Sequence, residues 1–170
     1  NTEVLPTANA KDVVRQFPYQ NGLLVLTKTN GGYPYLLFHI NEFGIIQQQE
    51  LDSNYFPNVS LVGNNIDIVI KQDNTITLLA QVGFSTPKLY LTNITPEFDI
   101  IEKDTLSLFN SFRRVDRAYP TDDDGIMLST FDNKGDSCQY VFYKLNKNNN
   151  IVWTTNVKVP EKMLRIPRLK

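Results

Sequence analysis

The sequence predicts an all-β protein made of three tandem copies of a four-stranded antiparallel unit. Val, Ile, Leu, Tyr, Phe and Thr recur in short runs that are separated by Asn, Asp, Gly and Pro, a pattern typical of strands and turns. Apolar residues at helical spacing are almost lacking. The same order of turns and strands also returns about every 50 residues, and a period of that length indicates a repeat architecture.

Each copy begins with a strand that ends in a tight turn. The turns are Asn21-Gly22, Asp73-Asn74 and Asp124-Gly125. Asn21 lies 53 residues before Asn74 (74 − 21), which lies 50 residues before Asp124 (124 − 74). Residues of these types tolerate the positive φ that a two-residue hairpin requires. The strands that precede the turns are expected at 13–19, 66–72 and 114–119.

After the turn, each copy continues with a second strand, a loop with Gly, Ser or Pro, and a third strand. We expect the third strands at 35–40, 88–93 and 139–145, and the fourth strands begin at Ile45, Ile100 and Ile151. The chain is therefore divided into an N-terminal tether (1–12), three blade-like repeats (13–51, 66–102 and 113–156) and a basic C-terminal tail (157–170).

A four-stranded meander repeated at this interval is typical of a β-propeller blade. Runs such as 23–26 and 66–70 are apolar at nearly every position, as expected for strands that neighbouring blades cover on both faces. A β-sandwich or barrel is the alternative, and it explains the strands but not the repeated order of turns. The fold class predicted is thus all-β, with antiparallel four-stranded blades in tandem that form a partial β-propeller.

The third copy carries a family resemblance. It reads DGIMLS from Asp124, YVFYKLN from Tyr140 and NIVW from Asn150. This resembles the blades of exported bacterial β-propeller proteins, common among the Bacteroidetes, in which an Asp-Gly turn and a strand precede a Lys-Leu-Asp/Asn-x-x-Gly-x-ϕ-x-Trp hairpin. Asn150 stands at the glycine position, where a positive φ is expected, and Trp153 is expected to be buried against the next blade.

The resemblance implies a fold and an exported location, periplasmic or on the cell surface, with the tether leading to a lipid anchor. It implies no activity. Propellers close with about 4–8 blades, and only three are recognisable. We therefore expect a protein partner or additional blades to complete the ring.

Composition excludes several classes of function. The net charge of −1 argues against general electrostatic binding of nucleic acid. No apolar run approaches the roughly 18 residues that a membrane-spanning helix needs. No cofactor motif is present. His39 is the sole histidine, so no histidine pair or triad exists, and we expect a structural role for it.

Three groups of residues are candidate sites. Loop aromatics could stack on a sugar or seat a partner: Tyr33, Tyr35, Tyr55 and Phe56. Arg113 and Arg117 share one strand face, opposite Arg114, and either pair with nearby acids or form an anion-binding patch. Asp122, Asp123 and Asp124 are weak metal candidates, because their spacing does not match the ligand register of a calcium loop; a solvated turn is the simpler interpretation.

The sequence thus favours a non-enzymatic scaffold or accessory subunit that mediates protein–protein contacts in an extracytoplasmic assembly. One alternative is a glycan- or small-ligand-binding module. Another is a fragment of a propeller hydrolase whose active-site carboxylates lie on other blades.

Overall fold

The computed structural model of the chain describes residues 10–29, 34–57, 66–82, 88–107, 114–134 and 137–160. All regular structure in these segments is β, as predicted. The twelve strands are β1 (Ala10–Tyr19), β2 (Gly22–Thr29), β3 (Tyr35–Asn41), β4 (Gly44–Leu51), β5 (Ile66–Ile70), β6 (Ile76–Val82), β7 (Lys88–Ile94), β8 (Ile100–Leu106), β9 (Arg114–Pro120), β10 (Ile126–Lys134), β11 (Ser137–Leu145) and β12 (Ile151–Pro160).

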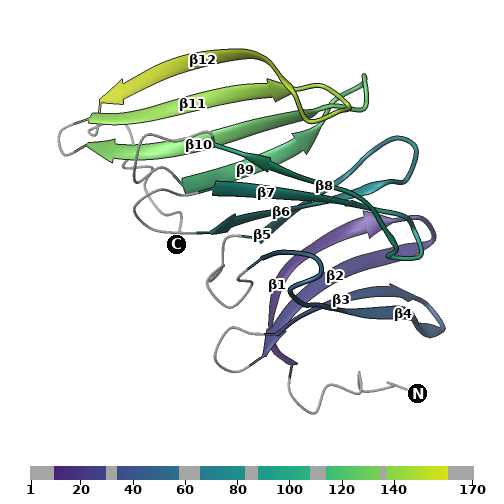
Figure 1. Cartoon of the computed structure of the whole chain (residues 1–170). Helices are drawn as coiled ribbons and strands as arrows, with labels where there is room; N and C mark the ends of the chain where they lie inside the picture. The colour runs from purple at the N-terminus through teal and green to yellow at the C-terminus, as the bar shows by residue number, and fades with distance from the viewer. Residues whose placement is uncertain are drawn as a thin grey trace.

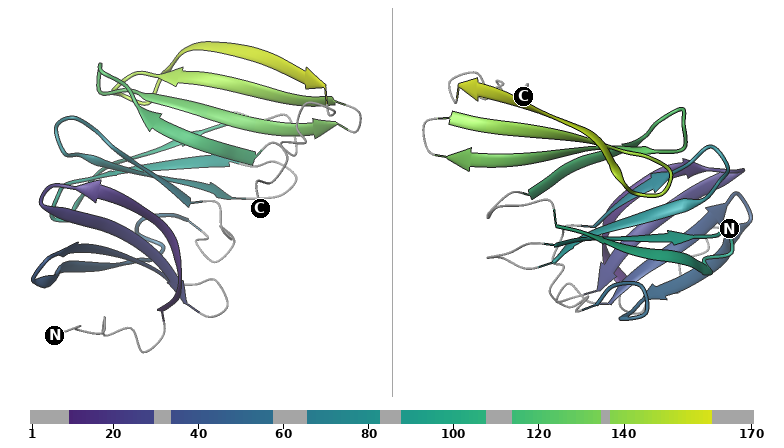
Figure 2. Two further views of the ribbon diagram at one scale, coloured as in Figure 1. Left: turned by 180° about the vertical axis from the view of Figure 1, so that it is seen from behind. Right: turned by 45° about the horizontal axis from the view of Figure 1, so that its top comes forward.

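The strands form three separate antiparallel meanders of four strands each (Figure 1). The first sheet contains β1–β4, the middle sheet β5–β8 and the third sheet β9–β12. Figure 2 shows the three sheets following one another in chain order from two further directions. The first strand of each meander lies innermost, because β5 contacts both β1 and β9. This arrangement is consistent with a partial propeller-like fold.

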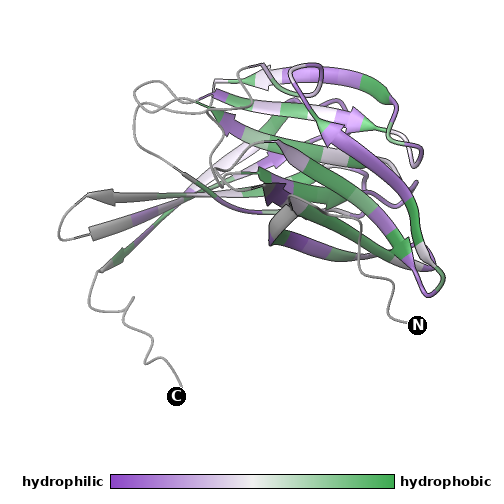
Figure 3. Ribbon diagram, turned by 90° about the horizontal axis from the view of Figure 1, so that it is seen from below, coloured by the Kyte–Doolittle hydropathy of each residue, from purple (hydrophilic) through white to green (hydrophobic). Residues whose placement is uncertain are grey.

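Two hydrophobic cores separate the sheets. The first core joins residues such as Leu24 and Leu37 of the first sheet to Ile68 and Leu78 of the middle sheet. The second joins the other face of the middle sheet to the third, through residues such as Leu79, Leu91, Leu128 and Val141. The middle sheet is therefore covered on both faces, which explains why every residue of β6 is buried. Figure 3 shows apolar segments (green) recurring along the strands of the molecule. A two-layer sandwich would bury only one face of each sheet.

The first hairpin of each sheet contains a residue with positive φ, at Gln20 (49°), Asn74 (65°) and Asp124 (57°). This confirms the expectation for Asn74 and Asp124, but in the first hairpin Gln20 takes the place expected for Asn21. The expectation of two-residue turns is wrong for the loops that contain Asn74 and Asp124. Each spans three residues, the last of which is left-handed.

Gly22 and Gly125 are needed for a different reason than the sequence suggested. Neither has a positive φ. A Cβ atom would instead collide with the carbonyl oxygen of Ile40 at Gly22 and of Leu145 at Gly125. Both glycines therefore permit the end of the third strand to approach the start of the second.

The hairpins between the third and fourth strands of the middle and third sheets share one turn design. The Thr95 N–H donates to Asp99 O and the Asn146 N–H to Asn150 O, both at 2.9 Å. The Thr95 hydroxyl and Asn146 amide oxygens accept further backbone N–H groups. The positive φ falls on Asn149 (60°), so the expectation that Asn150 replaces a positive-φ glycine is wrong by one residue.

Several strands extend beyond the boundaries predicted for the repeats. β1 begins at Ala10, β8 ends at Leu106 and β12 ends at Pro160. Each extension is paired with a neighbouring strand, as in Ser137 with Pro160, so residues 157–160 belong to the third sheet and not to a tail. None of the described segments is a helix of the length and apolarity needed to cross a bilayer.

Candidate functional site

The third sheet presents one face that no described strand covers. Ile126, Leu128 and Val141 point into the second core. Because side chains alternate along a strand, their neighbours lie on the opposite face. We call this surface the open face and define it by Met127, Phe131, Tyr140, Phe142, Trp153 and Val157.

Cross-strand pairing arranges the open face in rows. Phe131 pairs with Tyr140, which pairs with Val157. The rings of Phe131 and Tyr140 lie 5.1 Å apart, and those of Tyr140 and Phe142 are stacked at 6.4 Å. Trp153 and Val157 are 43% and 44% exposed. The three rings form an aromatic cluster, and Trp153 and Val157 lie on the same face together with the polar residues Ser129, Lys144 and Thr155. Exposed apolar side chains grouped in this way mark interaction sites on proteins.

The same positions in the other two sheets show what this surface is suited to contact. The second strands leave their hairpins at Gly22, Thr75 and Gly125. Four residues further along, the equivalent positions hold Leu26, Leu79 and Ser129. Their cross-strand partners on the third strands are Leu37, Leu91 and Phe142. Leu37 and Leu91 are fully buried by the following sheet, whereas Phe142 is only partly buried.

A second row of equivalent residues, one row further from the hairpin, shows the same difference in burial. Tyr35, Leu89 and Tyr140 occupy equivalent positions, and the first two are fully buried. The open face therefore carries the kind of side chain that binds one sheet to the next elsewhere in the molecule. Trp153, expected to be buried, is exposed because no described sheet follows the third, but it does lie on the side where a following sheet would pack.

A cavity of about 530 Å³ lies beside the innermost strands. It is lined by residues of β1, β5 and β9, among them Arg15, Phe17, Asp67, Arg117 and Tyr119. The Arg15 guanidinium lies 3.5 Å from the Asp67 carboxylate, measured from Nε to Oδ1. One strand from each sheet thus contributes a charged side chain to the same cavity.

Asp67 connects all three sheets. It is 8% exposed, and its Oδ2 accepts a hydrogen bond from the Ala118 N–H of β9 at 3.2 Å while its Oδ1 faces Arg15 of β1. Its Oδ1 also accepts from the Ile68 N–H at 3.0 Å. The apolar run 66–70 contains the signal for this role, a single acid within a buried strand, but its partners are distant in sequence.

The loop aromatics are not where the sequence suggested. Tyr35 and Phe56 are fully buried and Tyr55 is 6% exposed, so the expectation that these side chains are exposed is wrong. All three belong to the first core. The crossover after β4 folds inward, with the Tyr55 hydroxyl donating to Phe98 O at 2.9 Å, and burial raises the pKa of Tyr55. Tyr33 lies outside the described residues.

Of the predicted arginine patch, the structure describes the side chain of Arg117, which is exposed and lines the cavity. Arg113 lies outside the described part of the chain. The pairing expected between Arg117 and Asp116 or the 122–124 turn is not found among the described side chains. The turn has another cationic partner, Lys144.

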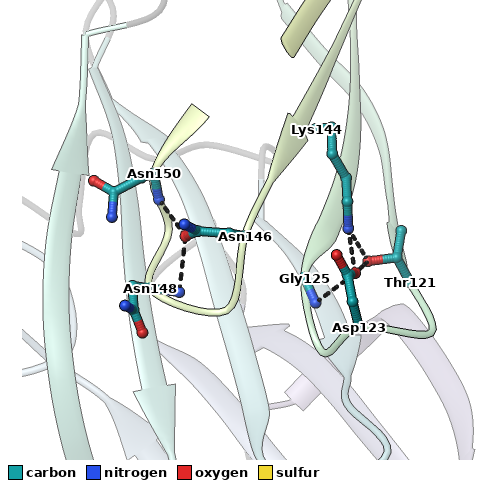
Figure 4. Close-up of polar contacts among 7 residues, drawn as sticks. All are labelled: Thr121, Asp123, Gly125, Lys144, Asn146, Asn148 and Asn150. Carbon is teal, nitrogen blue, oxygen red and sulfur yellow. Dashed lines mark hydrogen bonds and ion pairs between the residues drawn. The ribbon is translucent and has the colours of Figure 1, made fainter. Parts of the chain in front are cut away.

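Lys144 extends from β11 to the turn before β10, where its ammonium group donates to Asp123 Oδ1 and to the Thr121 hydroxyl (Figure 4). The Lys144 and Thr121 hydrogen bonds lower the pKa of Asp123 from 3.8 to about 2. The carboxylate considered for a cation therefore binds an ammonium group. Across the described ranges, no three His, Cys, Asp or Glu side chains are grouped as metal ligands would be.

Replacing Lys144 by methionine should raise the pKa of Asp123 from about 2 towards 3.8. Because the folded-state pKa is depressed, the pair stabilises the fold above pH 3.8 and this contribution is lost as the pH falls through about 2. A carboxylate NMR titration measures the shift, with Lys147→Met in the exposed neighbouring turn as the control. An unchanged Asp123 midpoint in the Lys144 variant would contradict the assignment.

His39 has a structural environment. It is 4% exposed, packs edge-on against Tyr19 with ring centroids 5.0 Å apart, and its pKa is lowered by burial. No hydrogen-bond partner for its Nε2 is found among the described residues. Its position corresponds to that of Lys144 in the third sheet.

Comparison of the chain with protein-family models, curated proteins and solved structures finds no significant match. The open face and the Arg15–Asp67–Arg117 cavity are accordingly the features on which a functional proposal can be built.

Proposed function

We propose that this chain is a non-enzymatic, propeller-type scaffold or accessory subunit that binds a protein partner through the open face of its third sheet. The observation that carries the proposal is the equivalence of Phe142 and Tyr140 to residues that are fully buried between sheets elsewhere in the molecule. Aromatic residues supply much of the affinity of protein interfaces, because they bury large apolar areas.

We place this scaffold in an extracytoplasmic assembly. That part of the proposal rests on the resemblance of the third repeat to blades of exported bacterial propellers. Detection of the full-length protein in the periplasmic or surface fraction of the native cell tests it, and a purely cytoplasmic distribution contradicts it.

Site-specific photo-cross-linking tests the binding surface. Thr155 lies beside Phe142 in the centre of the open face and is exposed, so an unnatural aromatic photoprobe fits there without disturbing the core. In the native cell, we expect a discrete protein adduct from position 155 and none from the exposed turn residue Asp122. Adding Phe142→Asp should lower the adduct yield about tenfold or more, since a charge is then buried at the contact. Equal yields from positions 155 and 122 would refute the proposal.

The cavity supports a second proposal, that of a small-ligand-binding module. It offers two arginines and apolar walls in about 530 Å³, within the range of small-molecule sites. Stacking of a glycan on Tyr55 or Phe56 has lost its support, because both side chains are buried. Calorimetric titration with small carboxylates and monosaccharides, with Arg117→Gln as the control, decides this; no heat from either class rejects it.

A further inference from the structure

We propose that the partner on the open face is a fourth four-stranded sheet of the same repeat type, whose innermost strand carries an Asp or Glu in register with Arg117. The inference deepens the proposed function, on which it rests, by stating the chemistry of the partner.

Arg15, Asp67 and Arg117 occupy equivalent positions in the three sheets. Each is the cross-strand partner of the equivalent second-strand residue: Arg15 pairs with Leu26, Asp67 with Leu79 and Arg117 with Ser129. In all three sheets the pairing is regular from the hairpin to this position, and the register shifts of β1 and β9 lie beyond it. The charge at this position thus runs positive, negative, positive from the first sheet to the third.

Each existing interface between sheets uses this position. Arg15 of the first sheet extends to Asp67 of the middle sheet, at 3.5 Å. Asp67 in turn accepts the backbone N–H of Ala118, the neighbour of Arg117 on the third sheet. In both interfaces, the charged side chain at this position therefore contacts the innermost strand of the next sheet.

Arg117 is the equivalent residue of the third sheet, which no described sheet follows. It lies on the open face with Ser129 and Phe142, and no described acidic side chain lies within ion-pairing distance of it. A fourth sheet could dock on the third as the middle sheet docks on the first. The residue of the fourth sheet that is equivalent to Arg15, Asp67 and Arg117 would then lie beside Arg117. A carboxylate there would continue the alternation of charge and would pair with the guanidinium, as Asp67 pairs with Arg15.

A second copy of the chain is a poorer partner. It would present its first sheet, and that sheet carries Arg15 at the position in question, so two guanidinium groups would meet. Like charges brought together at an interface oppose binding. The surface of the first sheet that a preceding sheet would cover is also less available, because Val25 (7% exposed) and Phe38 (0%) are already buried.

Trp153 provides a direct readout, since it is the sole tryptophan of the chain and lies on the open face. We would link a second copy of residues 66–107, which contains Asp67 but no tryptophan, to the C-terminal end of the full chain. Docking of this appended sheet should shift Trp153 emission to shorter wavelength and protect it from acrylamide quenching. The matched control carries Asp67→Arg in the appended copy alone.

We expect the Asp-to-Arg control to reduce the docking equilibrium constant about tenfold or more, because like charges then meet. The difference between the two fusions should disappear when Arg117 is replaced by alanine, as in a double-mutant cycle. Docking that is insensitive to the appended charge, or an appended sheet that leaves Trp153 as exposed as before, overturns the inference. If adducts from position 155 persist in that case, the proposed function still stands.

Sedimentation of the native chain gives an independent test that does not depend on the folding of a fusion. We expect a species of 19.5 kDa with exposed Trp153 emission at micromolar concentration. A dimer of twice that mass in which Trp153 is protected would identify a second copy as the partner and would overturn the inference.

Discussion

Replacing Phe56 by alanine should lower the free energy of unfolding by about 3–5 kcal/mol, the usual cost of removing a buried Phe side chain. Phe56 is fully buried in the first core, between the first and middle sheets. Its backbone N–H also donates to Asp52 O at 3.2 Å, which holds the crossover in place. Removal of the ring leaves a cavity in a densely packed interior, which adds to the loss of stability.

Phe43→Ala is the matched control, since it deletes the same ring from a hairpin where Phe43 is 83% exposed. It should change stability by no more than about 0.5 kcal/mol. Urea denaturation with unchanged m-values gives both numbers. Similar, small effects for the two variants would show that Phe56 is a surface residue, and would return it to the set of candidate ligand-binding aromatics.

The repeat architecture was predictable because it depends on local signals. Turn residues such as Asn74 and Asp124 and the apolar runs between them specify hairpins from neighbouring residues alone. The reason why each turn residue is required was harder to predict. Gly22 is required by the approach of Ile40, which lies in another strand, so its role cannot be derived from the turn itself.

The candidate site depended on contacts between distant parts of the chain. Whether Tyr55 is a ligand-facing or a core residue is decided by Phe98, 43 residues away, to which its hydroxyl donates. Similarly, Asp67 can be recognised as a junction only when Arg15 and Ala118 are placed beside it. The sequence predicted Arg117 as a binding residue on its strand, but its equivalence to Arg15 and Asp67 requires the strand registers.

Replacing Asp67 by alanine should destabilise the fold by about 2–4 kcal/mol, because the Ala118 and Ile68 N–H groups lose their acceptor and Arg15 loses its ion-pair partner. The Arg15 Nε and the Ala118 N–H both face this carboxylate. The control is Asp12→Ala, which breaks the Lys28–Asp12 pair at 3.6 Å, where the Asp12 side chain is 65% exposed. Loss of that surface pair should cost less than about 1 kcal/mol, as measured by the same urea denaturation.

Exchanging the two charges, with Arg15→Asp and Asp67→Arg together, distinguishes an isolated ion pair from a junction of three sheets. The exchange retains an attractive pair between β1 and β5. It nevertheless removes the acceptor of the Ala118 N–H and places two arginines, at 67 and 117, around one cavity. The exchanged protein should therefore remain less stable than the native one by about 1–3 kcal/mol, the cost of an unsatisfied buried donor. Full recovery of stability would mean that position 67 does not couple the middle sheet to the third, and the alternation of charge would then give no reason to expect an acid opposite Arg117.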